Sequence, residues 1–450
     1  MLMFHSCFFF TYGTLLHTMR NFFLYFFHSF LITSCIHCQS SPCNCSNLES
    51  KCDKNVHVEE KNADILPTRS QPIIQRVDGP QCPAGFQIQQ DTTDANRLPY
   101  TFPAFPWKIQ TTYKVRARIT AQPVRLAPHR WVIADHKGRV QVIEIVKNTK
   151  MELREVWKTQ LPDVVWSAPT VMQDGQMWVG CDDDFVYRLN ASTGVIIGQV
   201  KPFECVYNVK NNPEATRCDM DSGFVALREG GVLAGGAGVV KLHADGQVAW
   251  RYGVRTHVRG KPVVDVTGHV YFTALGGEIG SLDMTGTLRW KEQAPARCDS
   301  SPLVTDHCLM IVGCDDRTLN AFSTVDGHPV WKLYVPGEFR GAGALSPDGS
   351  VVYWGALDRY LYAVETATGK VRWRYRTSGR HLHAPWVDRG GNILVFPEEN
   401  RGYLLSAEGN LLGTLDVPAI VDAPLAFVDE NTVLLGLETG DLLLMTGAIQ

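Results

Sequence analysis

A repeat of about 40 residues constrains the fold of this chain more than any other feature. Turn glycines recur at positions 194, 246, 286, 327, 369 and 409, at intervals of 52, 40, 41, 42 and 40 residues. A tryptophan stands four residues after four of them, at Trp250, Trp290, Trp331 and Trp373. A proline opens an apolar run at Pro169, Pro262, Pro302, Pro385 and Pro424. Units of this length, each with four short apolar runs, predict the four-stranded blades of a β-propeller.

Each clear unit carries an aspartate three residues after its first glycine. These aspartates are Asp183, Asp316 and Asp358, and a second glycine lies fourteen residues after the first. An Asp side chain accepts hydrogen bonds from backbone amides one or two residues on, which favours a tight turn between strands. The run from Asp182 to Asp184 could suggest calcium binding, but the matching aspartates of the other units indicate a turn.

The segment from Ala363 to Trp373 resembles the tryptophan-docking repeat of quinoprotein-like propellers, Ala-x-Asp-x-x-Thr-Gly-x-x-x-Trp, with Glu365 in place of Asp. The resemblance covers roughly residues 104–446. It implies that each tryptophan packs flat between adjacent blades, on the Ala of one motif and the Gly of the next. The blade-docking residues that it implies are Trp107, Trp157, Trp250, Trp290, Trp331 and Trp373. Gly198 and Gly413 stand where a tryptophan is expected.

We count eight units, which begin near residues 129, 165, 221, 258, 298, 339, 381 and 421. The last unit reaches Leu444 without a following Gly-x-x-x-Trp strand, and an open ring would expose a strand edge. Trp107-Lys108 matches Trp290-Lys291, so residues 104–112 are predicted to supply the missing outer strand of blade 8. The predicted fold is all-β: an eight-bladed propeller of four-stranded antiparallel blades, residues 104–446, closed by an N-terminal strand.

Residues 1–35 are predicted to be an export signal. The apolar run 22–32 is too short to span a bilayer but fits the h-region of a signal peptide, and Arg20 after Met19 supplies a positive charge. We therefore expect translation to start at Met19. Leu31-Ile32-Thr33-Ser34-Cys35 resembles a bacterial lipobox, which implies lipidation of Cys35. The alternatives are a plain secretory signal and an uncleaved anchor built from residues 1–36.

Residues 36–103 read as a flexible, cysteine-containing linker, because no period of 2 or 3.6 persists in them. Four cysteines cluster there: Cys38, Cys43, Cys45 and Cys52. Their spacings match no zinc pattern, so disulfide formation or accident is favoured over a metal site.

Thirteen cysteines are many for a reduced compartment. Cys205 and Cys218 lie in an insertion, residues 201–222, and are predicted to form a disulfide. Cys181 and Cys314 occupy the same place in blades 2 and 5, which lie apart around the ring. We predict that both are buried free thiols.

Residues just before each Pro-led strand should surround the central axis, where propellers bind ligands. The candidate channel-mouth residues are Trp166, Arg259, Asp299, Arg340, His383 and Asp422, with His257 and His381 close by. A carboxylate and a histidine could form a general base. A polar, solvated mouth is the preferred reading, because no motif holds these groups together. No catalytic, cofactor-binding or metal-binding residue is predicted.

These features favour a non-catalytic binding or assembly scaffold in the cell envelope, at the bacterial outer membrane or in the periplasm. With 43 Lys and Arg against 46 Asp and Glu, nothing indicates nucleic-acid binding. The chain resembles the lipoprotein propellers of the outer-membrane β-barrel assembly machine, which implies a lipid tether and protein partners on one face. The alternatives are a ligand-sensing propeller and a dehydrogenase that uses pyrroloquinoline quinone (PQQ). PQQ is disfavoured as a cofactor, because no two cysteines are adjacent and the repeats lack long inserted loops.

Overall fold

The computed structural model describes residues 63–64, 82, 97–103, 105–205, 218–423 and 425–447 of the 450-residue chain. Residues 1–59 and 60–450 form two separate units, and every described residue belongs to the second. The predicted signal, the lipidation at Cys35 and the four-cysteine cluster therefore lie outside the described residues.

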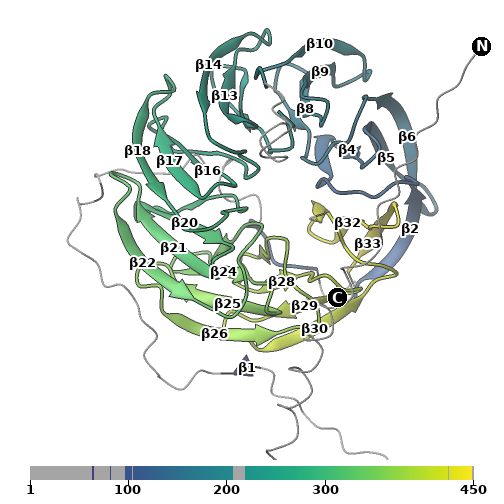
Figure 1. The fold of residues 1–450 in the computed structure, drawn as a ribbon. Helices are drawn as coiled ribbons and strands as arrows, with labels where there is room; N and C mark the ends of the chain where they lie inside the picture. Colours follow the sequence, from purple (N-terminus) through teal and green to yellow (C-terminus); the bar gives the residue numbers. More distant parts are fainter. Residues whose placement is uncertain are drawn as a thin grey trace, which may run out of the picture. The chain divides into compact units, whose positions relative to one another are not determined.

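Eight four-stranded antiparallel blades form a ring (Figure 1), and the all-β prediction is confirmed. The part of the chain that the structure describes contains no helix long and apolar enough to cross a membrane. The blades are numbered in chain order, and their strands run from the innermost to the outermost. This numbering places the blade boundaries close to the predicted unit starts.

The strands of the first four blades have the following bounds. Blade 1 contains β3 (Val124–Ala127), β4 (Arg130–Ala134), β5 (Arg139–Lys147) and β6 (Met151–Gln160). Blade 2 contains β7 (Thr170–Val171), β8 (Gln176–Gly180), β9 (Val186–Asn190) and β10 (Ile196–Val200). Blade 3 contains β11 (Val225–Ala226), β12 (Val232–Gly235), β13 (Gly238–Leu242) and β14 (Val248–Gly253). Blade 4 contains β15 (Val263–Val264), β16 (Val270–Thr273), β17 (Glu278–Leu282) and β18 (Leu288–Gln293).

The other four blades continue the ring to the C-terminal end. Blade 5 contains β19 (Leu303–Val304), β20 (Leu309–Cys314), β21 (Thr318–Ser323) and β22 (Pro329–Tyr334). Blade 6 contains β23 (Ala344–Leu345), β24 (Val351–Gly355), β25 (Tyr360–Glu365) and β26 (Val371–Arg376). Blade 7 contains β27 (Trp386–Val387), β28 (Ile393–Val395), β29 (Arg401–Leu405) and β30 (Leu411–Asp416). Blade 8 contains β31 (Ala426–Asp429), β32 (Thr432–Gly436), β33 (Asp441–Thr446) and, outermost, β2 (Lys108–Lys114).

The ring is closed by β2, as predicted from the sequence. It pairs antiparallel with β33, from Lys108 opposite Thr446 to Lys114 opposite Asp441. The strand begins later than the predicted range 104–112, because residues 105–107 pack against the neighbouring blade before the pairing starts. With β2 in place, blade 8 has four strands like the other blades, and the outer edge of β33 is paired.

Burial explains why the middle strands are continuous apolar runs. Every residue of β20 and β21 is buried, because these strands lie between two neighbouring blades. The outer strand β22 instead alternates, with Trp331 and Leu333 buried and their neighbours more exposed. This alternation is expected for a strand with one face against the core and one toward solvent.

Tryptophans link adjacent blades at five positions. The indole N–H of Trp331 in blade 5 donates to the carbonyl oxygen of Thr366 in blade 6 at 2.8 Å. A Cβ added to Gly369 would lie 2.7 Å from the same indole, so only glycine allows this approach. Ala321 lies opposite Trp331 in its own blade. The same donation joins Trp157 to Ala191, Trp250 to Met284, Trp290 to Thr324 and Trp373 to Ala407.

Blade 2 has Gly198 at the docking position, and Arg188 fills the space. Its Nη1 donates to the carbonyl oxygen of Ala244 in blade 3 at 3.0 Å. A Cβ added to Gly246 would lie 2.9 Å from Arg188 Nε, so the guanidinium covers this glycine as the indoles cover theirs. A planar guanidinium thus replaces the indole as both a flat surface and a donor.

Trp107 does not dock as the resemblance implied, and this expectation is corrected. Its indole N–H donates to Pro103 in its own segment at 3.0 Å, and it packs in a core cluster shared by blades 7 and 8. Phe105, 5.1 Å from Trp107 between ring centroids, covers Gly413 of blade 7. The two rings fill the gap that blade 7 leaves where it lacks a tryptophan.

The described residues of the expected linker are bonded to the propeller. β1 (Ala63–Asp64) pairs antiparallel with the outer strand of blade 6. Cys82 forms a disulfide with Cys308 in blade 5. The N–H of Leu98 donates to Val387 in blade 7 at 2.8 Å, and Leu98 is buried. The prediction of a flexible linker therefore does not hold for these residues. Their partners are strand edges and a cysteine of the ring, and the hydrophobic periodicity of the sequence does not predict such contacts.

Candidate functional site

The topology places the predicted channel-mouth residues at one end of the blades. Because successive strands run in opposite directions, the connection from an outer strand to the next inner strand lies at the same end as the turn between the second and third strands. The connections from an outer strand to the next inner strand carry five of the predicted channel-mouth residues: Trp166, Arg259, Asp299, His383 and Asp422. Arg340 lies in such a connection as well, between β22 and β23.

Asp221 contacts an arginine and a histidine at this end of the ring. Its carboxylate lies 3.0 Å from Arg259 Nε and 2.6 Å from His257 Nε2. Arg259 also approaches Asp299, with 3.9 Å between Nη1 and Oδ2. His257 is only 5% exposed, so this histidine is a buried partner of Asp221 and offers no free base to a substrate.

A second group is centred on Arg340. Its guanidinium binds both carboxylate oxygens of Asp315 at 3.0 Å and reaches Glu338 at 3.0 Å. Such a two-point contact fixes the orientation of the arginine. Burial raises the pKa of Asp299, while the positive charges of Arg259 and Arg340 act against this shift.

A third group joins blades 8, 1 and 7. Arg118 forms a two-point ion pair with Asp422, with Nη2 2.7 Å from Oδ1. Burial lowers the pKa of His383, against the opposing charges of Asp422 and Glu398. His381 is buried under blade 6, where burial lowers its pKa to about 3, and it contacts Thr377 at 2.9 Å. It belongs to the core and not to the mouth.

Trp166 is 38% exposed, and its indole N–H donates to Asp182 at 2.7 Å. The ring of His136 meets it edge-on, 4.7 Å away. Burial, followed by the negative charge of Asp219, raises the pKa of Asp182 to about 7. Two of the six predicted residues are thus in direct contact, Arg259 with Asp299. His383 and Asp422 share the third group, and Trp166 and Arg340 each lie in a different one.

The aspartates of the repeat hold turns, in agreement with the sequence interpretation. Asp183 accepts the N–H of Phe185 at 3.2 Å, and Asp358 accepts the N–H of Tyr360 at 3.1 Å. Asp184 instead binds Lys201 at 2.7 Å. Within the residues that the structure describes, no group of three or more His, Cys, Asp or Glu side chains could hold a metal ion.

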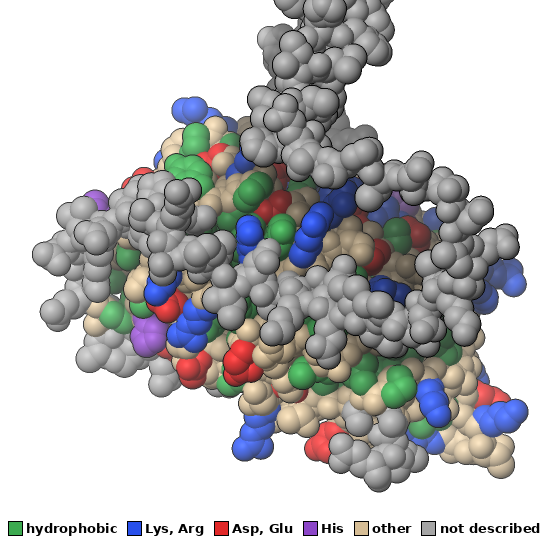
Figure 2. All heavy atoms as spheres, turned by 90° about the horizontal axis from the view of Figure 1, so that it is seen from below, with side chains coloured by type: hydrophobic (Ala, Val, Ile, Leu, Met, Phe, Trp, Pro, Cys, Tyr) green, Lys and Arg blue, Asp and Glu red, His purple; other side chains and the backbone are tan. Residues whose placement is uncertain are grey.

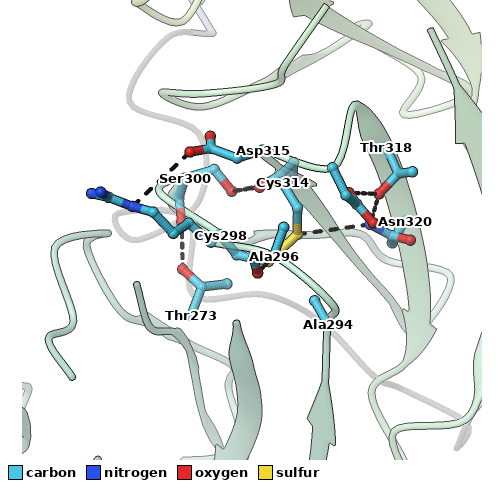
Figure 3. The surroundings of a disulfide bond; sticks show 12 residues. Thr273, Ala294, Ala296, Cys298, Ser300, Cys314, Asp315, Thr318 and Asn320 are labelled. Carbon is cyan, nitrogen blue, oxygen red and sulfur yellow. Dashed lines mark hydrogen bonds and ion pairs between the residues drawn. A yellow bond between two sulfur atoms is a disulfide. The ribbon is translucent and has the colours of Figure 1, made fainter. Parts of the chain in front are cut away.

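The structure pairs Cys205 with Cys218 and corrects the prediction for Cys314. Cys314 forms a disulfide with Cys298, with 4.1 Å between their Cα atoms (Figure 3). Cys181 is a buried free thiol, as predicted, and burial raises its pKa to about 12. The sequence argument compared Cys314 only with Cys181 at the equivalent position of another blade. It therefore did not predict this disulfide, because Cys298 and Cys314 lie at the same end of a single blade.

This disulfide stiffens the mouth between blades 4 and 5. It joins the connection that carries Asp299 to the turn that carries Asp315, and Asn320 donates to Cys314 Sγ at 3.8 Å. Ser300 accepts the N–H of Gly313 at 3.1 Å and donates to its carbonyl at 2.9 Å (Figure 3). Asp315 and Asp299 therefore sit on a cross-linked support, which is the physical requirement for a preformed binding face.

The side of the molecule seen in Figure 2 carries Lys and Arg side chains interspersed with Asp and Glu side chains.

The ring and its docked tryptophans define an eight-bladed quinoprotein-like β-propeller. Its residues 235–355 and 337–446, just under half of the chain, match the family model described as outer membrane protein assembly factor BamB, so this part of the ring is similar to PQQ-repeat propellers. A stretch of 100 residues is 28% identical to the outer membrane protein assembly factor BamB of Bordetella pertussis, covering 22% of this chain and 26% of that protein.

A second curated relative is a tetrathionate hydrolase of Acidithiobacillus ferrooxidans, 24% identical over 208 residues, 46% of this chain and 36% of that protein. The matches thus span about a quarter and about a third of the two curated relatives. BamB from Moraxella catarrhalis superposes with a TM-score of 0.57 at 16% identity, over 76% of this chain and 100% of that one. Quinohemoprotein alcohol dehydrogenase from Comamonas testosteroni gives 0.60 at 12% identity, over 76% and 77%. At these identities the structural likeness shows the fold.

Proposed function

We propose that this protein is an exported, membrane-tethered propeller that acts as a non-catalytic assembly scaffold for envelope proteins. The observation that carries the proposal is the match of residues 235–446 to the BamB family model, from the outer half of blade 3 through blade 8. The three disulfides among the described residues support an oxidising compartment, because such bonds persist in the envelope and outside the cell.

The partner docks on the mouth end of the blades in this proposal. The cross-linked support of Asp299 and Asp315, together with the two-point contact of Arg340, gives this end fixed charges of both signs. Fixed charges favour one docking orientation and penalise wrong partners. The exposed ring of Trp166 adds an aromatic surface of the kind that concentrates binding energy in protein interfaces.

A photo-cross-linking amino acid placed at Arg340 in native membranes tests the docking face. Val195 is the matched control, since it is 60% exposed but lies in the turn between β9 and β10, at the other end of the blades. We expect a discrete cross-linked protein from position 340 and none from position 195. Equal products from both positions, or none from either, would contradict docking at the mouth.

Two further measurements separate the parts of the proposal. Mass spectrometry of the mature N-terminus is expected to find acyl chains on Cys35, and an unmodified N-terminus elsewhere would remove the lipid tether. The absorbance spectrum of the purified protein tests the enzymatic alternative. A bound quinone would absorb in the near ultraviolet and would favour a dehydrogenase over a scaffold.

A further inference from the structure

A pocket of about 310 Å³ lies where the inner strands of blades 7, 8 and 1 meet residues 97–102. Its walls include four aromatic side chains, those of Tyr100, Trp131, Trp386 and Phe427. None of its lining residues belongs to the charged groups of the mouth. The pocket is therefore a second feature of the ring that the proposed scaffold function does not explain.

The aromatic walls are fixed in place by packing. The ring of Phe427 lies 5.9 Å from Tyr100 and 5.4 Å from Trp386 between centroids, with interplanar angles of 69° in both cases. Trp131 is 3% exposed and Trp386 is 5% exposed. Edge-to-face contacts of this kind are the favourable arrangement of aromatic rings. The pocket thus exists before any ligand arrives.

Arg125 supplies a positive charge at the rim. It lies directly opposite Trp131 in the ladder between β3 and β4, so the two side chains project on the same face of the blade. Arg125 is exposed, and within the part of the chain that the structure describes no carboxylate forms an ion pair with it. Among the described residues, the buried indole N–H of Trp131 also has no hydrogen-bond partner.

Tyr100 places a neutral hydroxyl near this charge. Burial, with the negative charge of Asp429, raises its pKa to about 12, while the positive charge of Arg125 acts in the opposite direction. The phenol is therefore a hydrogen-bond donor at every physiological pH. Arg125 lines the same pocket as Tyr100, so its guanidinium lies near the phenol.

We propose that this pocket binds an aromatic side chain of a partner polypeptide that is followed by an acidic residue. A volume of 310 Å³ is at the small end for ligand pockets and suits one aromatic side chain. The carboxylate of the acidic neighbour pairs with Arg125, and the aromatic ring packs among Tyr100, Trp386 and Phe427. The same charge disfavours a basic residue at the position next to the aromatic side chain.

The N-terminal segment completes the site. Leu98 and Tyr100 line the pocket, and the segment is held there because Leu98 donates to Val387 at 2.8 Å and Tyr100 accepts the N–H of Arg389 at 3.0 Å. The inner strands alone would leave one wall missing.

Fluorine NMR with a short peptide tests the proposal on the full chain. The probe is acetyl-Gly-Phe-Asp-Gly-amide with a fluorine on its phenyl ring, and the matched peptide carries Asn in place of Asp. We expect saturable broadening of the fluorine signal, with the Asp peptide bound about five- to tenfold more tightly, the usual gain from one charge-assisted contact.

Two variants locate the binding. Arg125→Gln is expected to remove the preference for the Asp peptide, whereas Arg251→Gln, at an exposed arginine on β14, is expected to retain it. Arg125 is exposed, so its replacement should leave the melting temperature unchanged. The proposal is overturned if the wild-type chain shows no saturable broadening, if the two peptides bind equally, or if Arg125→Gln keeps the preference. Failure of the mouth cross-linking would leave this result intact, because the two sites share no residue.

Discussion

Arg188 in blade 2 donates to the carbonyl oxygen of Ala244 in blade 3 at 3.0 Å, in the place where other blades use a tryptophan. The carbonyls that accept from Trp250 and Trp373 likewise stand two residues before a turn glycine, as Ala244 stands before Gly246. The interface therefore depends on a flat donor above a glycine, and two different side chains meet that requirement.

Replacing Arg188 by alanine should destabilise the ring. The carbonyl of Ala244 would lose its donor, and Gly246 would lose its cover, at a cost of about 1–3 kcal/mol in the free energy of unfolding. Denaturant unfolding would measure the change. Arg251→Ala is the control, expected to stay within about 0.5 kcal/mol because Arg251 is exposed. An Arg188→Ala variant as stable as this control would refute the docking role.

The repeat period predicted the number of blades and the closing strand because both depend on backbone pairing at fixed intervals. Arg188 could not be predicted in this way, since its role depends on the absence of a tryptophan at position 198 and on a neighbour 58 residues further on. The site was predicted in part: the connections that carry Trp166, Arg259 and Arg340 were identified from their spacing. Their partners Asp182, Asp221 and Asp315 come from other loops, and only the folded ring brings them together.

Trp331→Ala should cost about 3–5 kcal/mol of unfolding free energy, the usual loss for a buried tryptophan. Trp331 is 2% exposed and joins blades 5 and 6. Tyr334 on the same strand is 48% exposed, so Tyr334→Ala serves as the matched control and should change stability little. The melting temperatures of the two variants and of the wild type test this prediction. Equal melting temperatures would show that the blades do not depend on the indole.

Truncation tests ring closure. Both truncated chains carry Cys308→Ser, because removal of Cys82 would otherwise leave a free thiol. A chain without residues 1–96 keeps the packed segment 97–103 and β2, and we expect a folded monomer. A chain without residues 1–115 exposes the edge of β33, where residues 442–445 are buried in the intact ring, and should aggregate. Light scattering that does not distinguish the two chains would contradict closure by β2.

Asp182 should make stability decrease as pH rises. Its pKa in the folded chain is about 7, raised from 3.8, so the folded state holds a proton that the unfolded state releases between about pH 4 and 7. The stability that this group contributes is present below that window and is lost through it. Asp182→Asn removes the titration. The melting temperature of the variant relative to wild type should therefore rise between pH 5 and pH 8, while Glu152→Gln, at an exposed position, should show no trend. A pH-independent difference for Asp182→Asn would contradict the raised pKa.

Peptide mapping without reductant tests the cysteine assignments. Trypsin followed by cyanogen bromide cuts after Met310, between Cys298 and Cys314. The fragments 298–310 and 311–317 should stay joined until a reductant is added, and tandem mass spectrometry should assign the link to Cys298 and Cys314. Cys181 should react with iodoacetamide only after unfolding, because it is buried and its pKa is raised. Alkylated Cys314 in the unreduced sample would show that the pair is absent.

The disulfide between Cys82 and Cys308 determines how the ring carries mechanical load. A pull on the chain between β1 and Cys82 passes through the two sulfur atoms into blade 5. Residues 83–107 and the closing strand β2 lie outside that path, so the hydrogen bonds between β2 and β33 are not sheared. A force applied to the N-terminal part of the chain can thus reach the ring without separating β2 from β33.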